Sequence, residues 1–185
     1  DVEAREVMVV EANTSPWSDR SDLGCTMDPI AIEYPWVAWR DIRRLDELAY
    51  PWDAMAKNIE TGETINLSND PVTGERVWGS VVHVDLRGGL AVFNAGWVIG
   101  DPSRVFMEIV AVDLGNGARR QITSAPGEQY YPTVTEDWIA WVDLREPGGS
   151  STMACSADIY GQNRLTGEEL PLVAEGDALH EAPLD

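Results

Sequence analysis

The fold is decided by the stretch WVAWRDIR at residues 36–43, because its pattern returns twice further along the chain. The later copies read SVVHVDLR at residues 80–87 and WIAWVDLR at residues 138–145. A self-similar unit indicates a repeat architecture. The positions that the copies share are Trp39, Asp41, Arg43, His83, Asp85, Arg87, Trp141, Asp143 and Arg145.

A second phrase follows each of these stretches. An acidic residue precedes a glycine by nine positions, and an aliphatic residue comes five positions after that glycine. The acid–glycine pairs are Asp53 and Gly62, Glu108 and Gly117, and Asp158 and Gly167. Because glycine takes positive φ at little cost, each glycine predicts a hairpin turn. The two phrases together define a unit of roughly fifty residues, the length of a four-stranded propeller blade.

The strand pattern within a unit supports this interpretation. In residues 138–143, Ile139 and Trp141 share one face of a strand, and Trp138 and Ala140 share the other. Both faces are apolar, which is typical of a strand that is buried on both sides. A blade stacked between two neighbours has such strands. We therefore expect an all-β chain that forms a partial β-propeller of about three four-stranded blades.

The repeat spacing also predicts the organisation of the chain. An N-terminal extension at 1–28, which could contribute one strand to a blade, precedes the first unit. Blades are expected at 29–68, 69–123 and 124–173, and residues 174–185 resemble the start of a further blade. The segment between the two phrases is longest in the second unit, where we expect a long loop at a blade end.

Composition excludes some classes of function. The 13 basic residues are outnumbered by 32 acidic ones, which gives a formal net charge of −19 and argues against nucleic acid as a partner. No apolar run approaches the ~20 residues of a membrane-spanning helix. The two cysteines, Cys25 and Cys155, allow one internal disulfide or two free thiols, and both alternatives stay open.

The third unit resembles the repeat of TolB-type β-propellers, in particular the related repeats of bacterial and archaeal cell-surface proteins. The matching residues are Pro132, Val134, Trp141, Asp143, Arg145, Asp158, Ile159, Tyr160, Thr166, Gly167 and Leu172. The resemblance implies a ring, commonly of six blades, that serves as an interaction or ligand-binding platform. Some relatives are domains of peptidases or polysaccharide lyases. Together with the acidic composition and the two cysteines, the resemblance also implies a secreted, periplasmic or cell-surface location.

Three blades are about half of such a ring and too few to close one. An open stack would leave an apolar face at each end. We therefore expect either further blades in the same gene product or a protein partner, such as a second copy, that completes the ring.

The shared aspartates and arginines are interpreted as structural ion pairs, because every unit repeats them whereas a functional site normally breaks the symmetry. No catalytic residue, metal site or cofactor is predicted, and the sequence lacks a G-x-S-x-G nucleophile motif. Whether the chain is an enzyme stays open, with a non-catalytic role favoured.

The candidate ligand-binding residues lie outside the shared pattern and are Trp97, Trp52, Asn94 and Asp101. An exposed indole beside polar side chains could stack on a sugar ring, although packing onto a blade would explain the tryptophans equally well. We therefore expect a non-catalytic binding or assembly module. The alternatives are a lectin-like carbohydrate-binding propeller, with a glycan as ligand, and an accessory propeller domain of a secreted hydrolase or polysaccharide lyase.

Overall fold

The computed structural model describes residues 30–42, 52–74, 77, 81–98, 105–145 and 157–173. The expected N-terminal extension and the start of a further blade lie outside these residues. Within the described ranges the regular structure is all strand, and there is no helix that could cross a membrane.

The strands form three separate four-stranded antiparallel sheets, in each of which the strand order follows the chain. Blade 1 consists of β1 (Ile30–Glu33), β2 (Trp36–Ile42), β3 (Trp52–Asn58) and β4 (Thr64–Asn66). Blade 2 consists of β5 (Val84–Arg87), β6 (Leu90–Val98), β7 (Val105–Asp113) and β8 (Arg119–Gln121). Blade 3 consists of β9 (Gln129–Val134), β10 (Trp138–Asp143), β11 (Asp158–Asn163) and β12 (Glu169–Val173). The expected all-β partial propeller is therefore confirmed.

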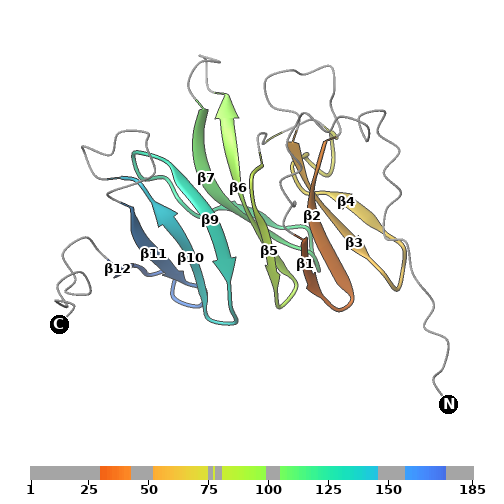
Figure 1. The fold of residues 1–185 in the computed structure, drawn as a ribbon. Coiled ribbons are helices and arrows are strands. Elements are labelled where there is room, and N and C mark those ends of the chain that lie inside the picture. Colours follow the sequence, from red (N-terminus) through yellow and green to blue (C-terminus); the bar gives the residue numbers. More distant parts are fainter. Residues whose placement is uncertain are drawn as a thin grey trace, which may run out of the picture.

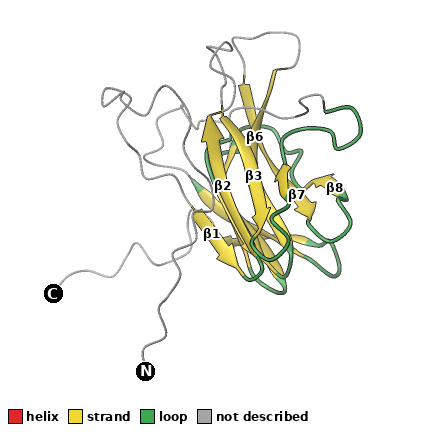
Figure 2. Cartoon of the chain, turned by 90° about the vertical axis from the view of Figure 1, so that its right-hand side faces the viewer, coloured by secondary structure: helices red, strands yellow, loops and turns green. Residues whose placement is uncertain are grey.

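The three sheets stand side by side, with blade 2 in the middle (Figure 1). The first strands β1, β5 and β9 are neighbours, so they form the inner edge of the stack. Viewed from the blade 1 side, the strands of that blade lie in front of the others (Figure 2).

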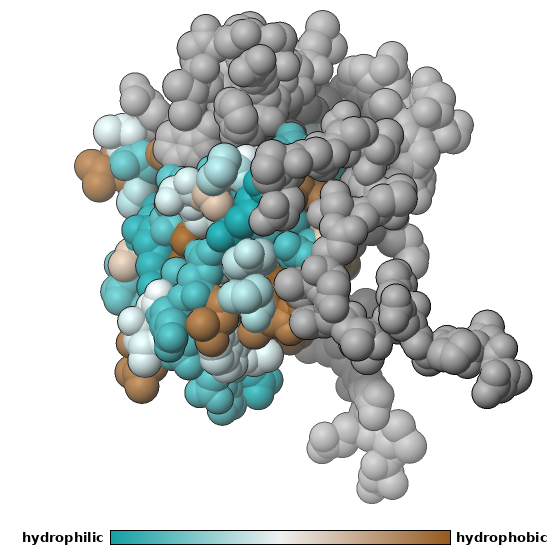
Figure 3. Space-filling view, turned by 90° about the vertical axis from the view of Figure 1, so that its left-hand side faces the viewer, coloured by the Kyte–Doolittle hydropathy of each residue, from teal (hydrophilic) through white to brown (hydrophobic). Residues whose placement is uncertain are grey.

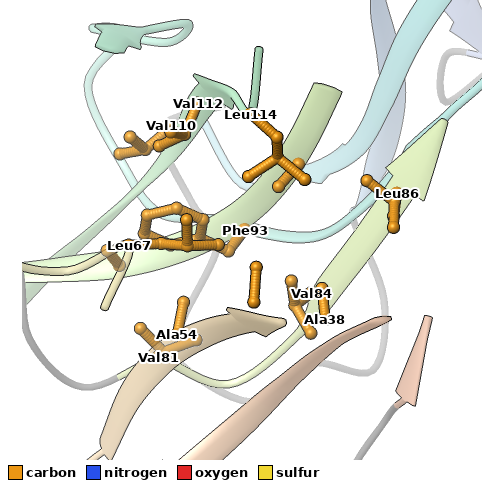
Figure 4. Close-up of a cluster of buried hydrophobic side chains, with 13 residues drawn as sticks. Ala38, Ala54, Leu67, Val81, Val84, Leu86, Phe93, Val110, Val112 and Leu114 are labelled. Atoms are coloured by element: carbon orange, nitrogen blue, oxygen red, sulfur yellow. The ribbon is translucent and has the colours of Figure 1, made fainter. Parts of the chain in front are cut away.

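Two buried apolar clusters fill the spaces between the sheets. The first joins blades 1 and 2 and includes Ala38, Val84 and Phe93, all at most 2% exposed (Figure 4). The second joins blades 2 and 3 and includes Val92 and Trp141, also buried. Both faces of blade 2 are thus covered, which explains why its central strands are apolar on both faces over most of their length.

One turn recurs in every blade, between the third and fourth strands. Gly62, Gly117 and Gly167 there have φ of 77°, 73° and 73°, as the sequence predicts. Each glycine N–H donates to the carbonyl of a residue four positions earlier. That earlier residue is Asn58, Asp113 or Asn163, whose side-chain Oδ1 also accepts two backbone N–H groups of the turn. The side chain and the glycine together fix the hairpin.

The sequence alignment of the second unit was wrong by one strand. Asp85 lies on the first strand, β5, whereas Asp41 and Asp143 lie on the second strands β2 and β10. Asp41 and Asp143 face Asp53 and Asp158 across their sheets, and the residue that faces Glu108 in blade 2 is Ala95.

Phe93 of β6 therefore takes the position that Trp39 and Trp141 occupy, and His83 does not. The misalignment arose because first and second strands share the same two-residue alternation. As a result, half of the segment in which a long loop was expected is the strand β6.

Gly127 illustrates a close approach that only glycine allows. Its φ is 91°, and a Cβ there would lie 2.4 Å from the carbonyl oxygen of Leu144. Gly62 has a similar φ of 77°, but a Cβ at Gly62 would meet no atom within 4 Å.

We predict that Gly127→Ala lowers the free energy of unfolding by roughly 3 kcal/mol or more, because it adds a backbone clash to the left-handed strain. Gly62→Ala should cost only about 1 kcal/mol.

Urea unfolding monitored by tryptophan fluorescence measures both variants. Equal losses of stability would contradict the tight packing of the segment before β9 against the end of β10.

Candidate functional site

Each blade has a backward face, toward the preceding blade, and a forward face, toward the next. We assign residues to one face or the other from the strand pairing and from their membership of the two buried clusters. The backward face is Ile30, Ile32, Val37 and Trp39 in blade 1, Val84, Leu86, Ala91 and Phe93 in blade 2, and Val134, Ile139 and Trp141 in blade 3. The forward face is Ala38, Ala54, Ala56 and Leu67 in blade 1, Val92, Ile109, Ala111 and Ile122 in blade 2, and Ala140, Ile159, Gly161 and Leu172 in blade 3.

The backward face of blade 1 exposes apolar side chains on its first strand. Ile30 and Ile32 are 65% and 71% exposed. The residues at the same positions of blade 2, Val84 and Leu86, are 2% and 6% exposed because blade 1 covers them. The exposure of this face is confined to its first strand, because Val37 and Met55 on the central strands of the same face are only 6% and 4% exposed.

On the forward face of blade 3, an apolar residue is likewise more exposed than the residues at the same repeat position in the other two blades. Leu67 and Ile122 are 0% and 8% exposed, whereas Leu172, at the same repeat position, is 44% exposed. Figure 3 looks onto this end of the stack and shows hydrophobic residues, in brown, at the surface among hydrophilic ones. The exposed apolar residues at this end are separated by hydrophilic ones, and Leu172 is the one whose repeat position is buried in the other two blades.

In blade 3 the shared tryptophan, aspartate and arginine form one buried cluster. The Trp141 indole N–H donates to Asp143 Oδ2 at 2.9 Å, and Arg145 donates to both carboxylate oxygens at 2.9 and 2.6 Å. Arg145 also donates to Glu169 at 2.8 Å, and its guanidinium carbon lies 3.7 Å from the centroid of the Tyr160 ring. The bidentate geometry and the aromatic contact suit arginine and would not suit lysine.

These contacts set the charge state of the cluster. Burial alone would raise the pKa of Asp143, but the hydrogen bonds from Arg145 and Trp141 outweigh it and hold the pKa below its ordinary value. The hydrogen bond to Asp143 raises the pKa of Arg145. Both groups stay ionised at neutral pH, as an ion pair within the fold requires.

Blade 2 lacks this cluster, since Phe93 and Ala95 replace the tryptophan and the aspartate. Glu108 instead accepts a hydrogen bond from the Thr123 hydroxyl at 2.5 Å. The Gln129 amide of β9 also lies 3.1 Å from the Glu108 carboxylate, in the orientation that satisfies its neighbours. Burial raises the pKa of Glu108. Glu108, on the third strand of blade 2, thus contacts blade 3.

Asp85 has a different role from the one expected by analogy with Asp143. Its Oδ2 accepts hydrogen bonds from the Thr133 hydroxyl at 2.9 Å and from the Val134 N–H at 2.8 Å. Both donors belong to β9, so Asp85 holds the inner strands of blades 2 and 3 together.

Arg87 makes a similar connection at the turns between first and second strands. It lies 3.6 Å from the carboxylate of Glu33 in blade 1 and 3.3 Å from that of Glu136 in blade 3. Arg87 is about half exposed, so each pair contributes little stability, but together they align the three turns. Arg43, the remaining arginine of the pattern, lies outside the described residues.

His83 and Asn94 pack together at the contact between blades 2 and 3. The His83 N–H donates to Asn94 Oδ1 at 2.9 Å, and the imidazole stands edge-on to Tyr131, with centroids 6.1 Å apart. Burial lowers the pKa of His83, although the charge of Asp85 opposes this shift. His83 is therefore a neutral packed histidine.

Two of the four predicted ligand-binding residues, Asn94 and Trp52, have described side chains, and neither side chain lines an open site. Asn94 is fully buried on β6, and Trp52 packs against the cluster between blades 1 and 2, with Arg40 4.1 Å from its ring centroid. Trp97 lies on β6 by its backbone, but its side chain is outside the described part, as is Asp101.

The proposed disulfide cannot be placed, since Cys25 and Cys155 both lie outside the described residues. Among the histidine, cysteine, aspartate and glutamate side chains that the structure describes, no three are grouped so as to hold a metal ion.

The geometry can be compared with known proteins. No protein-family model matches the sequence, and no curated protein matches it. Solved structures do match: a protein assigned as TolB from Agrobacterium tumefaciens aligns with a TM-score of 0.54 and 15% identity, over 78% of this chain and 48% of that one.

TolB from Acinetobacter baumannii aligns with a TM-score of 0.52 and 15% identity, over 80% of this chain and 32% of that one. The tricorn protease aligns with a TM-score of 0.52 and 15% identity, over 77% of this chain and 12% of that one. The chain thus spans about half or less of these structures, and what it shares with them is a TolB-like β-propeller fold.

The Asp143 cluster leads to a prediction about stability and pH. Asp143→Asn should lower the free energy of unfolding by about 2 kcal/mol at pH 7, because it removes the buried carboxylate that binds Arg145 through both oxygens and leaves Glu169 as the carboxylate that pairs with it. Since the folded-state pKa of Asp143 is depressed, this contribution is present above the unfolded pKa of about 3.9 and is lost as the pH falls through the folded value.

Urea unfolding of both proteins at pH 7 and below pH 4 measures the effect. The gap between wild type and variant should shrink in acid. A gap that is the same at both pH values would mean that the ionised carboxylate is not what stabilises the blade.

Proposed function

We propose that this chain is a non-catalytic binding and assembly module of the periplasm or the extracellular space. It associates with protein through the two ends of its blade stack. These ends are the backward face of blade 1 and the forward face of blade 3.

The exposure of Ile30 and Ile32 carries the proposal. Covering an aliphatic side chain of this size contributes about 2 kcal/mol, and the chain itself covers the same positions in its later blades. A partner that covers both isoleucines gains a comparable contribution.

A non-catalytic role is supported by how the polar repeat residues are used. Asp143 and Arg145 bind each other, Asp85 binds β9, and Arg87 bridges two turns. These groups are engaged within the fold rather than directed at a substrate. The net charge of −19 favours solubility, and a TolB-like fold suits a platform role.

The two alternatives predict different partners. A lectin-like propeller would bind a glycan through Trp97 and Asp101, since Asn94 and Trp52 are engaged in packing. An accessory domain would bind a secreted hydrolase or polysaccharide lyase through the same end faces that the main proposal uses.

Co-purification tests the proposal. The tagged chain and its Ile30→Asp/Ile32→Asp variant are incubated with the extracellular fraction of the source organism, crosslinked and recovered. We expect the wild-type chain to retain protein, either its own copies or another species, and the variant to retain at least tenfold less. Val72→Asp serves as the control, because Val72 is 90% exposed and lies outside both end faces.

Equal recovery with wild type and double variant would contradict the proposal, as would recovery of the wild-type chain with no protein bound. Recovery of a glycan that depends on Trp97 would favour the lectin-like alternative instead.

A further inference from the structure

We propose that the inner edge of the stack, where blades 2 and 3 meet, binds an arginine side chain of a basic peptide segment. The ring of Tyr131 on β9 is the platform for the guanidinium group. Tyr131 contacts His83 of blade 2, so this site differs from both end faces. The inference therefore goes beyond the proposed function and does not depend on it.

Tyr131 lies where blade 3 departs from the repeat. In blade 1 the first-strand residue Ile30 pairs one to one with Trp39, and blade 2 has the same regular pairing. In blade 3 the register shifts, so that Tyr131 and Pro132 together lie opposite Trp141. Such a bulge re-aims a side chain, and bulges are common beside functional sites. Because scaffold positions repeat from blade to blade, a feature found in one blade alone is a candidate for function.

The backbone at Tyr131 is in the left-handed region. Its φ is 51°, and within the described part of the chain it is the one residue other than glycine with a positive φ. A left-handed conformation is costly for a bulky L-residue, and glycine would adopt it with less strain. The ring is 45% exposed, so core packing does not account for a tyrosine at this position. Strained residues of this kind cluster at ligand-binding sites.

Two neighbouring rings fix the surroundings of Tyr131. The Tyr130 ring is tilted against it with centroids 6.0 Å apart, and the His83 imidazole stands edge-on at 6.1 Å. Hydrogen bonds hold both neighbours in place. The Tyr130 hydroxyl donates to Glu128 Oε2 at 2.6 Å, and the His83 backbone N–H donates to Asn94 Oδ1 at 2.9 Å. The exposed ring thus belongs to an ordered aromatic cluster.

The charges that act on this cluster are negative. Burial lowers the pKa of His83, and the charge that opposes this shift is that of Asp85. Burial raises the pKa of Tyr130, and the hydrogen bond to Glu128 and the charge of Glu128 raise it further. The faces of aromatic rings are also electronegative, so rings and carboxylates together favour a cation. The formal net charge of −19 adds a long-range attraction for a basic segment.

Blade 3 already contains a contact of this kind, which indicates arginine as the cation. The guanidinium carbon of Arg145 lies 3.7 Å from the centroid of the Tyr160 ring, and Arg145 also donates to Glu169 at 2.8 Å. A planar guanidinium can stack on a ring and bind a carboxylate at the same time, which suits lysine less well. Tyr131 and the Glu128 carboxylate offer the same two elements. No arginine or lysine among the described residues stacks on Tyr131.

Variants that leave the net charge unchanged test the site. A hexa-arginine peptide is titrated into the chain, and calorimetry measures its dissociation constant. Tyr131→Leu should weaken binding about tenfold because it removes the aromatic face, whereas Tyr131→Phe should retain the wild-type affinity. Tyr34→Leu is the matched control and should also bind as the wild type does, because Tyr34 is 69% exposed but lies in blade 1 between β1 and β2.

Two further measurements separate binding from folding and locate the peptide. Tyr131→Gly relieves the left-handed strain, so the midpoint of urea unfolding should not fall, while the affinity for the peptide should fall about tenfold. In the His180→Gln variant, His83 is the single histidine of the chain. Its imidazole proton signals in NMR spectra should shift when the peptide is added.

Equal affinities of the wild type and Tyr131→Leu would overturn the inference, as would an equal loss of affinity in Tyr34→Leu. A lower urea midpoint for Tyr131→Gly would also overturn it, since the ring would then serve the fold. His83 signals that do not move on saturation with the peptide would show that the peptide binds elsewhere.

Discussion

Burial of both apolar faces of a small twisted sheet is the constraint on which this structure depends. A four-stranded sheet cannot bury two faces by itself, so each blade needs a neighbour on either side. Blade 2 has both neighbours, and Phe93 and Val92, on its opposite faces, are fully buried. Blades 1 and 3 have one described neighbour each, and their outer faces carry exposed apolar residues, among them Ile30, Ile32 and Leu172. The fold follows from this stacking rule.

Polar residues adapt this stacking from one blade to the next. In blade 3 the Asp143–Arg145 pair lies within a single sheet, while in blade 2 Glu108 and Asp85 reach the neighbouring sheet instead. Buried carboxylates need such partners, because an unpaired charge between apolar sheets is costly. The differences between blades therefore reflect which partner each acid finds. They give the contact between blades 2 and 3 more polar connections than a strictly repeated unit would provide.

The sequence predicted the fold class because alternation, glycine turns and repeat spacing all report local structure. It misplaced the second unit because Asp85 and Arg87 follow an alternating first strand, which resembles a second strand until the pairing is known. Another spacing in the sequence could have predicted the hairpin turns: Asn58, Asp113 and Asn163 each stand four residues before a turn glycine. The repeat count predicts an apolar face at each end of an open stack, but which residues are exposed there, such as Ile30, depends on packing that the sequence does not show. The burial of Asn94 and the packing of Trp52 could not be predicted for the same reason.

Amide hydrogen exchange along the three inner strands tests the stacking rule most directly. In the monomeric chain at low concentration, β5 and β9 should exchange slowly, because a preceding blade covers each of them. The first strand, β1, should exchange faster, and it should become as slow as β5 when its outer face is covered in an assembly. Exchange in β1 as slow as in β5 in the monomer would contradict the account, since the position of a blade in the stack would then not decide its protection.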